Sequence, residues 1–117
     1  MVDPTHLVGV GGIVGAVLRH FVSQAVDVES FPLGTLTVNV VGSFVLGLVT
    51  FLGLGNDALL LVGTGACGSF TTFSSFSVGV VDLWERGERL LSVGYATVNL
   101  VGALAALGLA WLLVVGV

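Results

Sequence analysis

Four long apolar stretches dominate this sequence, and its charged residues lie almost entirely between them. Only 9% of the 117 residues are charged, whereas 56% are hydrophobic. A soluble domain carries about a quarter charged residues, a disordered tail needs low hydrophobicity, and a nucleic-acid-binding face needs a surplus of basic residues. The chain has three basic residues and a net charge of -4. The sequence therefore predicts an integral membrane protein that is not an enzyme and binds no nucleic acid.

The apolar stretches are long enough to be transmembrane helices. Charges and turn signals bound them at 5–26, 33–54, 58–84 and 90–115. Each exceeds the roughly 20 residues that cross a lipid bilayer as a helix, and backbone groups in lipid must form their hydrogen bonds internally. We therefore predict an all-α membrane protein in which residues 1–117 form a single domain of four transmembrane helices.

Glycine is unusually frequent, at 18 residues. Within apolar helices, small residues let two backbones approach closely, often at a spacing of four residues. Gly11 and Gly15 have this spacing, as do Gly102 and Ala106. Four short helices do not easily enclose a water-filled path alone, so we expect them to pack against a second copy of the chain in a homo-oligomer.

Polar side chains inside the spans are costly and therefore informative. Thr35, Asn39 and Ser43 are four residues apart and share one helical face. The Asn39 amide either joins two helices by a hydrogen bond or faces an ion path, and Asn99 in the fourth span has the same two interpretations. Arg19 either extends toward the membrane interface or places a fixed positive charge at an anion entrance.

Residues 68–77 are the least helix-like part of the third span, because they combine Gly, Ser and Thr. Such side chains offer the backbone competing hydrogen bonds, so we expect a break or unwound turn near 68–71. A broken helix in a membrane exposes carbonyls that coordinate cations and amides that attract anions. Phe73 and Phe76 lie on one helical face. If they only filled the core or faced lipid, the hydroxyl groups around them would have no explanation.

Carboxylates are missing from the deep parts of the predicted spans. Proton-coupled transporters commonly bind the proton on an intramembrane carboxylate. The polar groups that remain are amides, hydroxyls and Arg19, all of which can donate hydrogen bonds. This set of donors favours an anion as the transported species.

Three motifs together resemble the Fluc (CrcB) fluoride channel family over essentially the whole chain. The motifs are Gly11-Gly12-x-x-Gly15-Ala16-x-x-Arg19-His20, Gly34-Thr35-Leu36-x-Val38-Asn39-x-x-Gly42-Ser43-Phe44 and Gly68-x-x-Thr71-Thr72-Phe73-Ser74-Ser75-Phe76. The third motif is the most specific of the three. Asn99 departs from the family pattern, because family members often carry a hydroxyl there.

The resemblance implies a passive, fluoride-specific channel that exports cytoplasmic fluoride across the plasma membrane and gives fluoride resistance. It implies an antiparallel, dual-topology homodimer in the lipid bilayer. A structural Na⁺ at the dimer centre would be bound by the backbone carbonyls of Gly68 and Thr71. The fluoride pore would be lined by Asn39, Thr72, Phe73, Ser75, Phe76, Tyr95 and Asn99.

Two other functions compete with a fluoride channel. A small dual-topology, proton-coupled exporter with four helices would need a Glu within the first span, whereas Glu29 lies in the loop that follows it. A non-transporting accessory subunit of a larger membrane complex would suit glycine-rich packing helices. That second alternative leaves the hydroxyls and phenylalanines of the third span unexplained.

Overall fold

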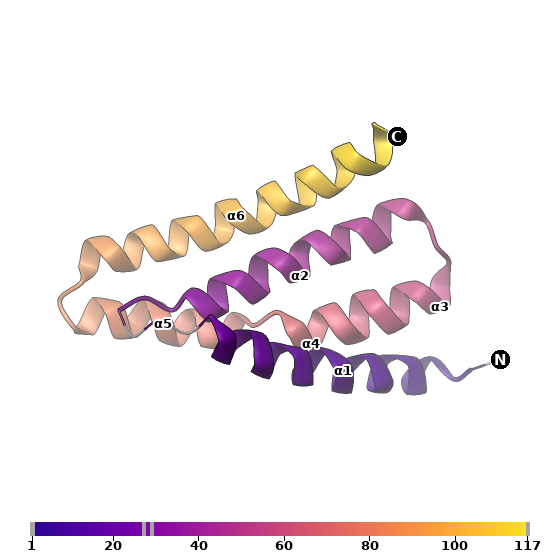
Figure 1. Ribbon diagram of the computed structural model, residues 1–117, viewed down its shortest axis with the longest axis horizontal. Coiled ribbons are helices and arrows are strands. Elements are labelled where there is room, and N and C mark those ends of the chain that lie inside the picture. Colours follow the sequence, from indigo (N-terminus) through magenta and orange to yellow (C-terminus); the bar gives the residue numbers. More distant parts are fainter. Residues whose placement is uncertain (1, 27, 29, 117) are drawn as a thin grey trace.

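The computed structural model describes residues 2–26, 28 and 30–116, which form an elongated bundle of helices (Figure 1). The bundle measures 53 × 32 × 20 Å along its principal axes. In chain order, its elements are α1 (Pro4–Ala25), α2 (Leu33–Leu52), α3 (Asn56–Ala58), η1 (Leu59–Cys67), α4 (Gly68–Phe70), α5 (Phe73–Glu85) and α6 (Arg89–Val115).

Among the described residues, four helical segments are long and apolar enough to cross a membrane. These segments are Pro4–Ala25, Leu33–Leu52, Asn56–Glu85 and Arg89–Val115. They confirm the prediction of an all-helical, multi-pass membrane chain. The second segment ends at Leu52 rather than at residue 54, because Gly53 adopts the left-handed conformation (φ 65°) that commonly terminates helices.

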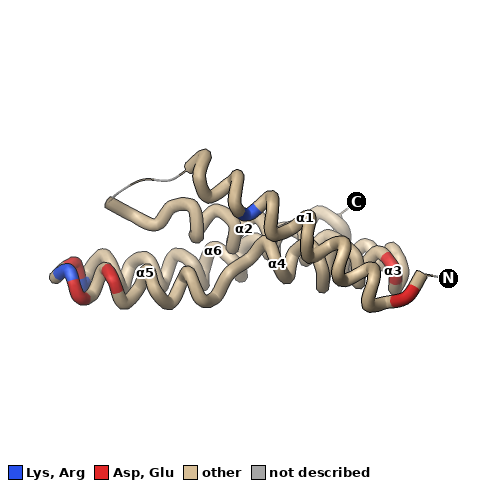
Figure 2. Tube along the Cα trace, turned by 90° about the horizontal axis from the view of Figure 1, so that it is seen from below, with Lys and Arg blue, Asp and Glu red and all other residues tan. Residues whose placement is uncertain are grey.

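Among the residues that the structure describes, the charged ones gather at the two ends of the bundle, apart from Arg19 on α1 (Figure 2). At one end, the Arg86 guanidinium lies 3.2 Å from the Asp82 carboxylate, and the Arg89 guanidinium lies 4.9 Å from the centroid of the Trp84 ring. A tryptophan beside basic side chains is typical of the membrane–water interface. The long axis of the bundle is therefore the direction in which the helices would cross the bilayer.

Small residues allow the helices to pack closely at two crossings. A Cβ atom on Gly11 would collide with the backbone carbonyl of Leu61 in η1, and one on Gly15 would collide with that of Ala66. At the other crossing, a Cβ on Gly47 of α2 would lie 2.8 Å from the Cβ of Ala110 in α6. Larger residues at these glycines would push the helices apart.

The third apolar segment changes its backbone geometry twice. Leu59–Cys67 form a π-helix, which is wider than an α-helix and is frequent at functional sites. After the short α4, Thr71 (φ -81°, ψ 159°) and Thr72 (φ -148°, ψ 120°) have extended backbones, and α5 begins at Phe73.

The extended residues lie slightly later in the chain than the sequence indicated. Gly68 is helical (φ -61°, ψ -33°) rather than part of an unwound turn. The cause is Thr71, because its N–H and its Oγ1 both donate to the Cys67 carbonyl, at 3.0 Å and 2.9 Å. These two bonds complete the helical turn through Phe70, so the extended backbone is confined to Thr71 and Thr72.

Candidate ion pathway

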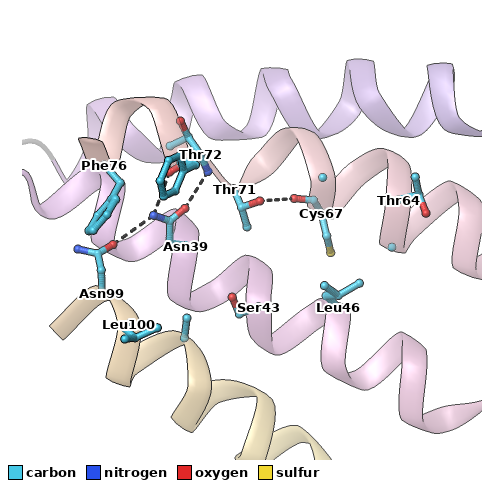
Figure 3. A pocket seen from close by; sticks show the side chains of 14 residues that line it. Asn39, Ser43, Leu46, Thr64, Cys67, Thr71, Thr72, Phe76, Asn99 and Leu100 are labelled. Atoms are coloured by element: carbon cyan, nitrogen blue, oxygen red, sulfur yellow. Dashed lines mark hydrogen bonds between the residues drawn. The ribbon is translucent and has the colours of Figure 1, made fainter. Parts of the chain in front are cut away.

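The extended residues of the third segment border a cavity of about 640 Å³ between α2, η1, α5 and α6 (Figure 3). The cavity brings together most of the residues that the sequence indicated for a pore or a metal site. Those that line it are Asn39, Gly68, Thr71, Thr72, Phe73, Phe76 and Asn99.

Asn39 joins α2 to the extended backbone of Thr72 through both halves of its amide. Its Oδ1 accepts the Thr72 N–H at 2.7 Å, and its Nδ2 donates to the Thr72 carbonyl at 3.1 Å. Thr72 has neither a helix nor a strand to satisfy these two backbone groups, and unpaired backbone groups in an apolar environment are costly. The Asn39 side chain therefore stabilises the extended conformation (Figure 3).

Asn99 extends this hydrogen-bonded chain to α6. Its Oδ1 accepts the second Nδ2–H of Asn39 at 3.1 Å, and its own Nδ2 donates to the Tyr95 carbonyl at 3.0 Å. The Asn99 residue is only 5% exposed. The two asparagine side chains therefore join helices, and both also line the cavity; whether the cavity is an ion path stays a prediction.

Two backbone carbonyls at this site lose the hydrogen bonds that a continuous helix would give them. In an α-helix, the Gly68 carbonyl would accept the Thr72 N–H, and the Thr71 carbonyl would accept the Ser75 N–H. Instead, the Thr72 N–H donates to Asn39, and the Ser75 N–H donates to the Thr72 hydroxyl at 3.1 Å. Both carbonyls belong to cavity-lining residues.

The aromatic residues form a row that continues from the cavity into the protein interior. The ring centroids of Phe73 and Phe76 are 5.8 Å apart, and those of Phe76 and Tyr95 are 5.7 Å apart. Phe73 is 79% exposed, whereas Tyr95 is fully buried and packs edge-on against Phe31 at 5.3 Å. Tyr95 therefore supports Phe76 from behind, and the two phenylalanines border the cavity.

Arg19 lies at a second, more polar cavity of about 410 Å³ between α1, α2 and α5. His20, Thr35 and Ser75 line this cavity with it. Thr72 lines both cavities. It therefore lies where the polar space at Arg19 adjoins the larger space at Asn39 and Phe76.

Two polar residues at the larger cavity were not among the predicted site residues. Ser43 follows Asn39 by one turn of α2, and Thr64 lies in η1. The spacing of Ser43 from Asn39 indicated the shared helical face, and this signal could have placed Ser43 at the site. Thr64 stands between Gly63 and Gly65 in an apolar run, and only the position of η1 shows that it borders the cavity.

Comparison with known proteins assigns the chain to a family. Residues 6–111 match the family described as CrcB-like protein, Camphor Resistance (CrcB). This chain belongs to the CrcB family. The match confirms the resemblance drawn from the three motifs, and it includes all the residues that line the two cavities.

Several relatives in the CrcB family are named as fluoride channels. The chain is 60% identical to fluoride-specific ion channel FluC 2 of Haloarcula marismortui over 93% of its own length and 92% of that protein. It is 54% identical to FluC 1 of Halobacterium salinarum over 95% and 93% of the two chains. It is 38% identical to FluC of Methanocaldococcus jannaschii over 89% and 88%. These names describe transport rather than catalysis.

Proposed function

We propose that this CrcB-family chain is a fluoride-specific ion channel that passively exports cytoplasmic fluoride across the plasma membrane and so gives fluoride resistance. The observation that carries this proposal is the Asn39 cavity. It combines amide and hydroxyl groups with two phenylalanine rings inside a bundle of membrane-spanning helices. Relatives that are similar over almost the whole chain carry the name of fluoride channels.

The chemistry of the cavity suits a small anion. Fluoride is strongly hydrated, so a pore must replace its water with hydrogen-bond donors, and amides and hydroxyls supply these. Aromatic rings are negative on their faces and positive at their edges. Ring edges of Phe73 and Phe76 stabilise an anion at the cavity and keep the path narrow.

Arg19 serves this path as a fixed positive charge at an anion entrance. It lines the polar cavity, which meets the larger cavity at Thr72. Ser75 and Thr35 add hydroxyl groups to the same polar cavity. An anion passing from Arg19 to Asn39 would thus meet donors along the whole route.

The positions of the acidic groups support passive transport. Among the described residues, the carboxylates of Asp3, Asp57, Asp82, Glu85 and Glu88 lie at the ends of helical segments. Proton-coupled transporters commonly bind the proton on such a group within the membrane. The membrane potential supplies about 2.3 kcal/mol per elementary charge per 100 mV and, with the cell interior negative, drives anions outward.

We further propose that the channel is an antiparallel, dual-topology homodimer. The single chain leaves Phe73 79% exposed and Gly68 exposed beside an open cavity, and a second copy would cover both. The extended residues Thr71 and Thr72 would act as a functional break in the third helix at the centre of this dimer. The chain's three basic residues give only a weak orientation signal, which suits insertion in both directions.

The backbone at this break fits a structural Na⁺. The Gly68 and Thr71 carbonyls have lost their helical donors to Asn39 and to the Thr72 hydroxyl, and unwound carbonyls of this kind coordinate Na⁺ in membrane proteins. Among the described residues, His, Cys, Asp and Glu form no cluster that could hold a metal, so the ligands would be backbone oxygens. A bound Na⁺ supplies a fixed positive charge near the anion path.

Fluoride efflux from liposomes tests the proposed function. Purified protein is reconstituted into liposomes loaded with potassium fluoride, a potassium ionophore balances the charge, and an electrode records the released fluoride. We expect rapid fluoride release, and no comparable chloride release from liposomes loaded with potassium chloride. Protein-free liposomes give the leak rate. Fluoride release at that leak rate, or equal release of chloride, would contradict a fluoride-specific channel.

A further inference from the structure

The Thr71 side chain contacts a different neighbour on each of its two sides. Its hydroxyl donates to the Cys67 carbonyl at 2.9 Å. Its methyl group packs on α2 at Gly42, where a Cβ atom would collide with the Thr71 Cγ2 and would lie 3.7 Å from the Thr71 Cβ. Gly42 is buried, and the methyl group occupies the volume that a side chain at position 42 would fill.

Gly42 and Asn39 are about one helical turn apart on α2, and both contact the extended residues of the third segment. Residues three apart on a helix are neighbours on one face. Asn39 bonds to both backbone groups of Thr72, and Thr71 packs on Gly42. Helix α2 therefore holds both extended residues, Thr72 through hydrogen bonds and Thr71 through close packing.

This packing acts on one particular peptide group. The Thr71 carbonyl and the Thr72 N–H belong to the same planar, trans peptide unit. Asn39 holds the N–H end of this unit through a bond of 2.7 Å, and the packing of Thr71 on Gly42 holds the other end. A Cβ at position 42 would push Thr71 away from α2 while Asn39 still held Thr72. The peptide unit would then tilt, and the Thr71 carbonyl would change direction.

We propose that Gly42 is a positioning residue of the Na⁺ site, because its lack of a side chain lets Thr71 pack on α2 and so fixes the orientation of the Thr71 carbonyl that would bind the ion. This inference rests on the proposed function, since the Na⁺ belongs to the proposed channel. Gly42 has no side chain to offer the ion and acts through Thr71. It therefore determines how well the break binds a cation rather than whether the helices span the membrane.

Thermal melting at different Na⁺ concentrations tests this role without measuring transport. Purified protein in detergent is melted in sodium chloride, with N-methylglucamine chloride added to keep the ionic strength constant. A ligand that binds only the folded state raises the melting temperature, so a fit against Na⁺ concentration gives the dissociation constant. Gly42→Ala should bind Na⁺ about tenfold more weakly than the wild type, because the added methyl group displaces Thr71.

A second variant removes the collision without restoring the glycine. Thr71→Ser deletes the methyl group and keeps the hydroxyl that bonds to Cys67. In Gly42→Ala/Thr71→Ser, the new Cβ therefore has space again, and the Phe70 Cδ2 at 3.2 Å needs only a slight tilt of its ring. We expect the double variant to bind Na⁺ within about twofold of Thr71→Ser alone. The alanine should thus cost affinity only when the threonine methyl group is present.

Gly47→Ala is the matched control on the same helix. Its Cβ would lie 2.8 Å from the Cβ of Ala110 in α6, at a crossing that does not involve the extended residues. This variant should lower the melting temperature at every Na⁺ concentration but leave the dissociation constant for Na⁺ unchanged. An equal loss of affinity in Gly47→Ala and Gly42→Ala would overturn the proposal, because any packing defect would then have the same effect.

The outcomes separate this inference from the function on which it rests. If Gly42→Ala binds Na⁺ like the wild type, or the double variant binds as weakly as Gly42→Ala, the positioning role is overturned. If Gly42→Ala does not fold, the double variant should restore folding, and a double variant that also fails to fold overturns the role. If the wild type releases fluoride from liposomes but melts alike at every Na⁺ concentration, the cation site and the positioning role fail and the channel function remains. If it shows neither response, all three fail.

Discussion

Replacing Asn39 with leucine isolates what its amide contributes to stability. Leucine has the same number of side-chain heavy atoms and the same branching, but it can neither donate nor accept a hydrogen bond. The variant Asn39→Leu therefore removes three bonds, two to Thr72 and one to Asn99. It leaves the N–H and the carbonyl of Thr72 without their partner, in a backbone that has no helix to replace it.

The structure indicates roughly how much the free energy of unfolding falls in this variant. An unpaired buried polar group costs about 1–3 kcal/mol, whereas a side-chain hydrogen bond between membrane helices averages about 0.6 kcal/mol. The three bonds are part-buried and border a cavity. We therefore take about 1 kcal/mol for each bond, the low end of the cost of an unpaired buried group. The total is about 3 kcal/mol, which for a domain of this size lowers the melting temperature by about 10 °C.

Thermal melting in detergent, followed by the fraction of protein that still elutes in the folded peak, measures this loss. Thr50→Val is the matched control on the same helix, because the Thr50 hydroxyl is exposed and bonds only to the Leu46 carbonyl one turn earlier, at 2.8 Å. That control should change the free energy of unfolding by less than about 0.5 kcal/mol. If Asn39→Leu melts within about 2 °C of the wild type, the extended Thr72 backbone does not depend on Asn39, and the reasoning is refuted.

Three further perturbations address the pathway and the packing. Phe73→Ile should lower fluoride efflux at least about tenfold, because the variant loses the positive ring edge that the phenylalanine contributes to the path. Normal efflux would remove Phe73 from the path. Gly15→Ala should destabilise the protein by about 2 kcal/mol or more, since its Cβ would collide with the Ala66 carbonyl. Melting curves measure this destabilisation, and an unchanged curve would contradict the close crossing of α1 and η1. Replacing Na⁺ with a bulky organic cation should lower efflux or melting temperature, and indifference to the cation would count against carbonyl coordination.

The four apolar segments could be predicted from the sequence because hydropathy and helix length alone determine them. Asn39, Asn99 and Arg19 could be singled out for a related reason, since a polar group within a span must have a compensating partner. The glycine-rich face of α1 was likewise visible, and its Gly11 and Gly15 do lie at a close helix crossing. These inferences use only the local chain and the properties of the bilayer.

Partners that are distant in sequence could not be predicted in this way. Asn39 and Asn99 are 60 residues apart, and whether they meet depends on how α2 and α6 are rotated about their axes. The position of the extended residues Thr71 and Thr72 was hard to predict for a similar reason, although the competing hydrogen bonds are only a few residues apart. Gly68 suggested an early end to the helix, but the hydroxyl of Thr71 bonds back to Cys67, and a sequence alone does not show which of two competing hydrogen bonds forms.

The hydrogen bonds of Asn39 connect the two proposed ion sites. By accepting the Thr72 N–H, its Oδ1 removes the helical partner of the Gly68 carbonyl, and this frees an oxygen for the proposed Na⁺. Its Nδ2 bonds to Asn99 at the cavity where the proposed fluoride would pass. Because both sites depend on the orientation of a single amide, a change at Asn39 should weaken cation and anion binding together, whereas a change at Asn99 should affect only the anion.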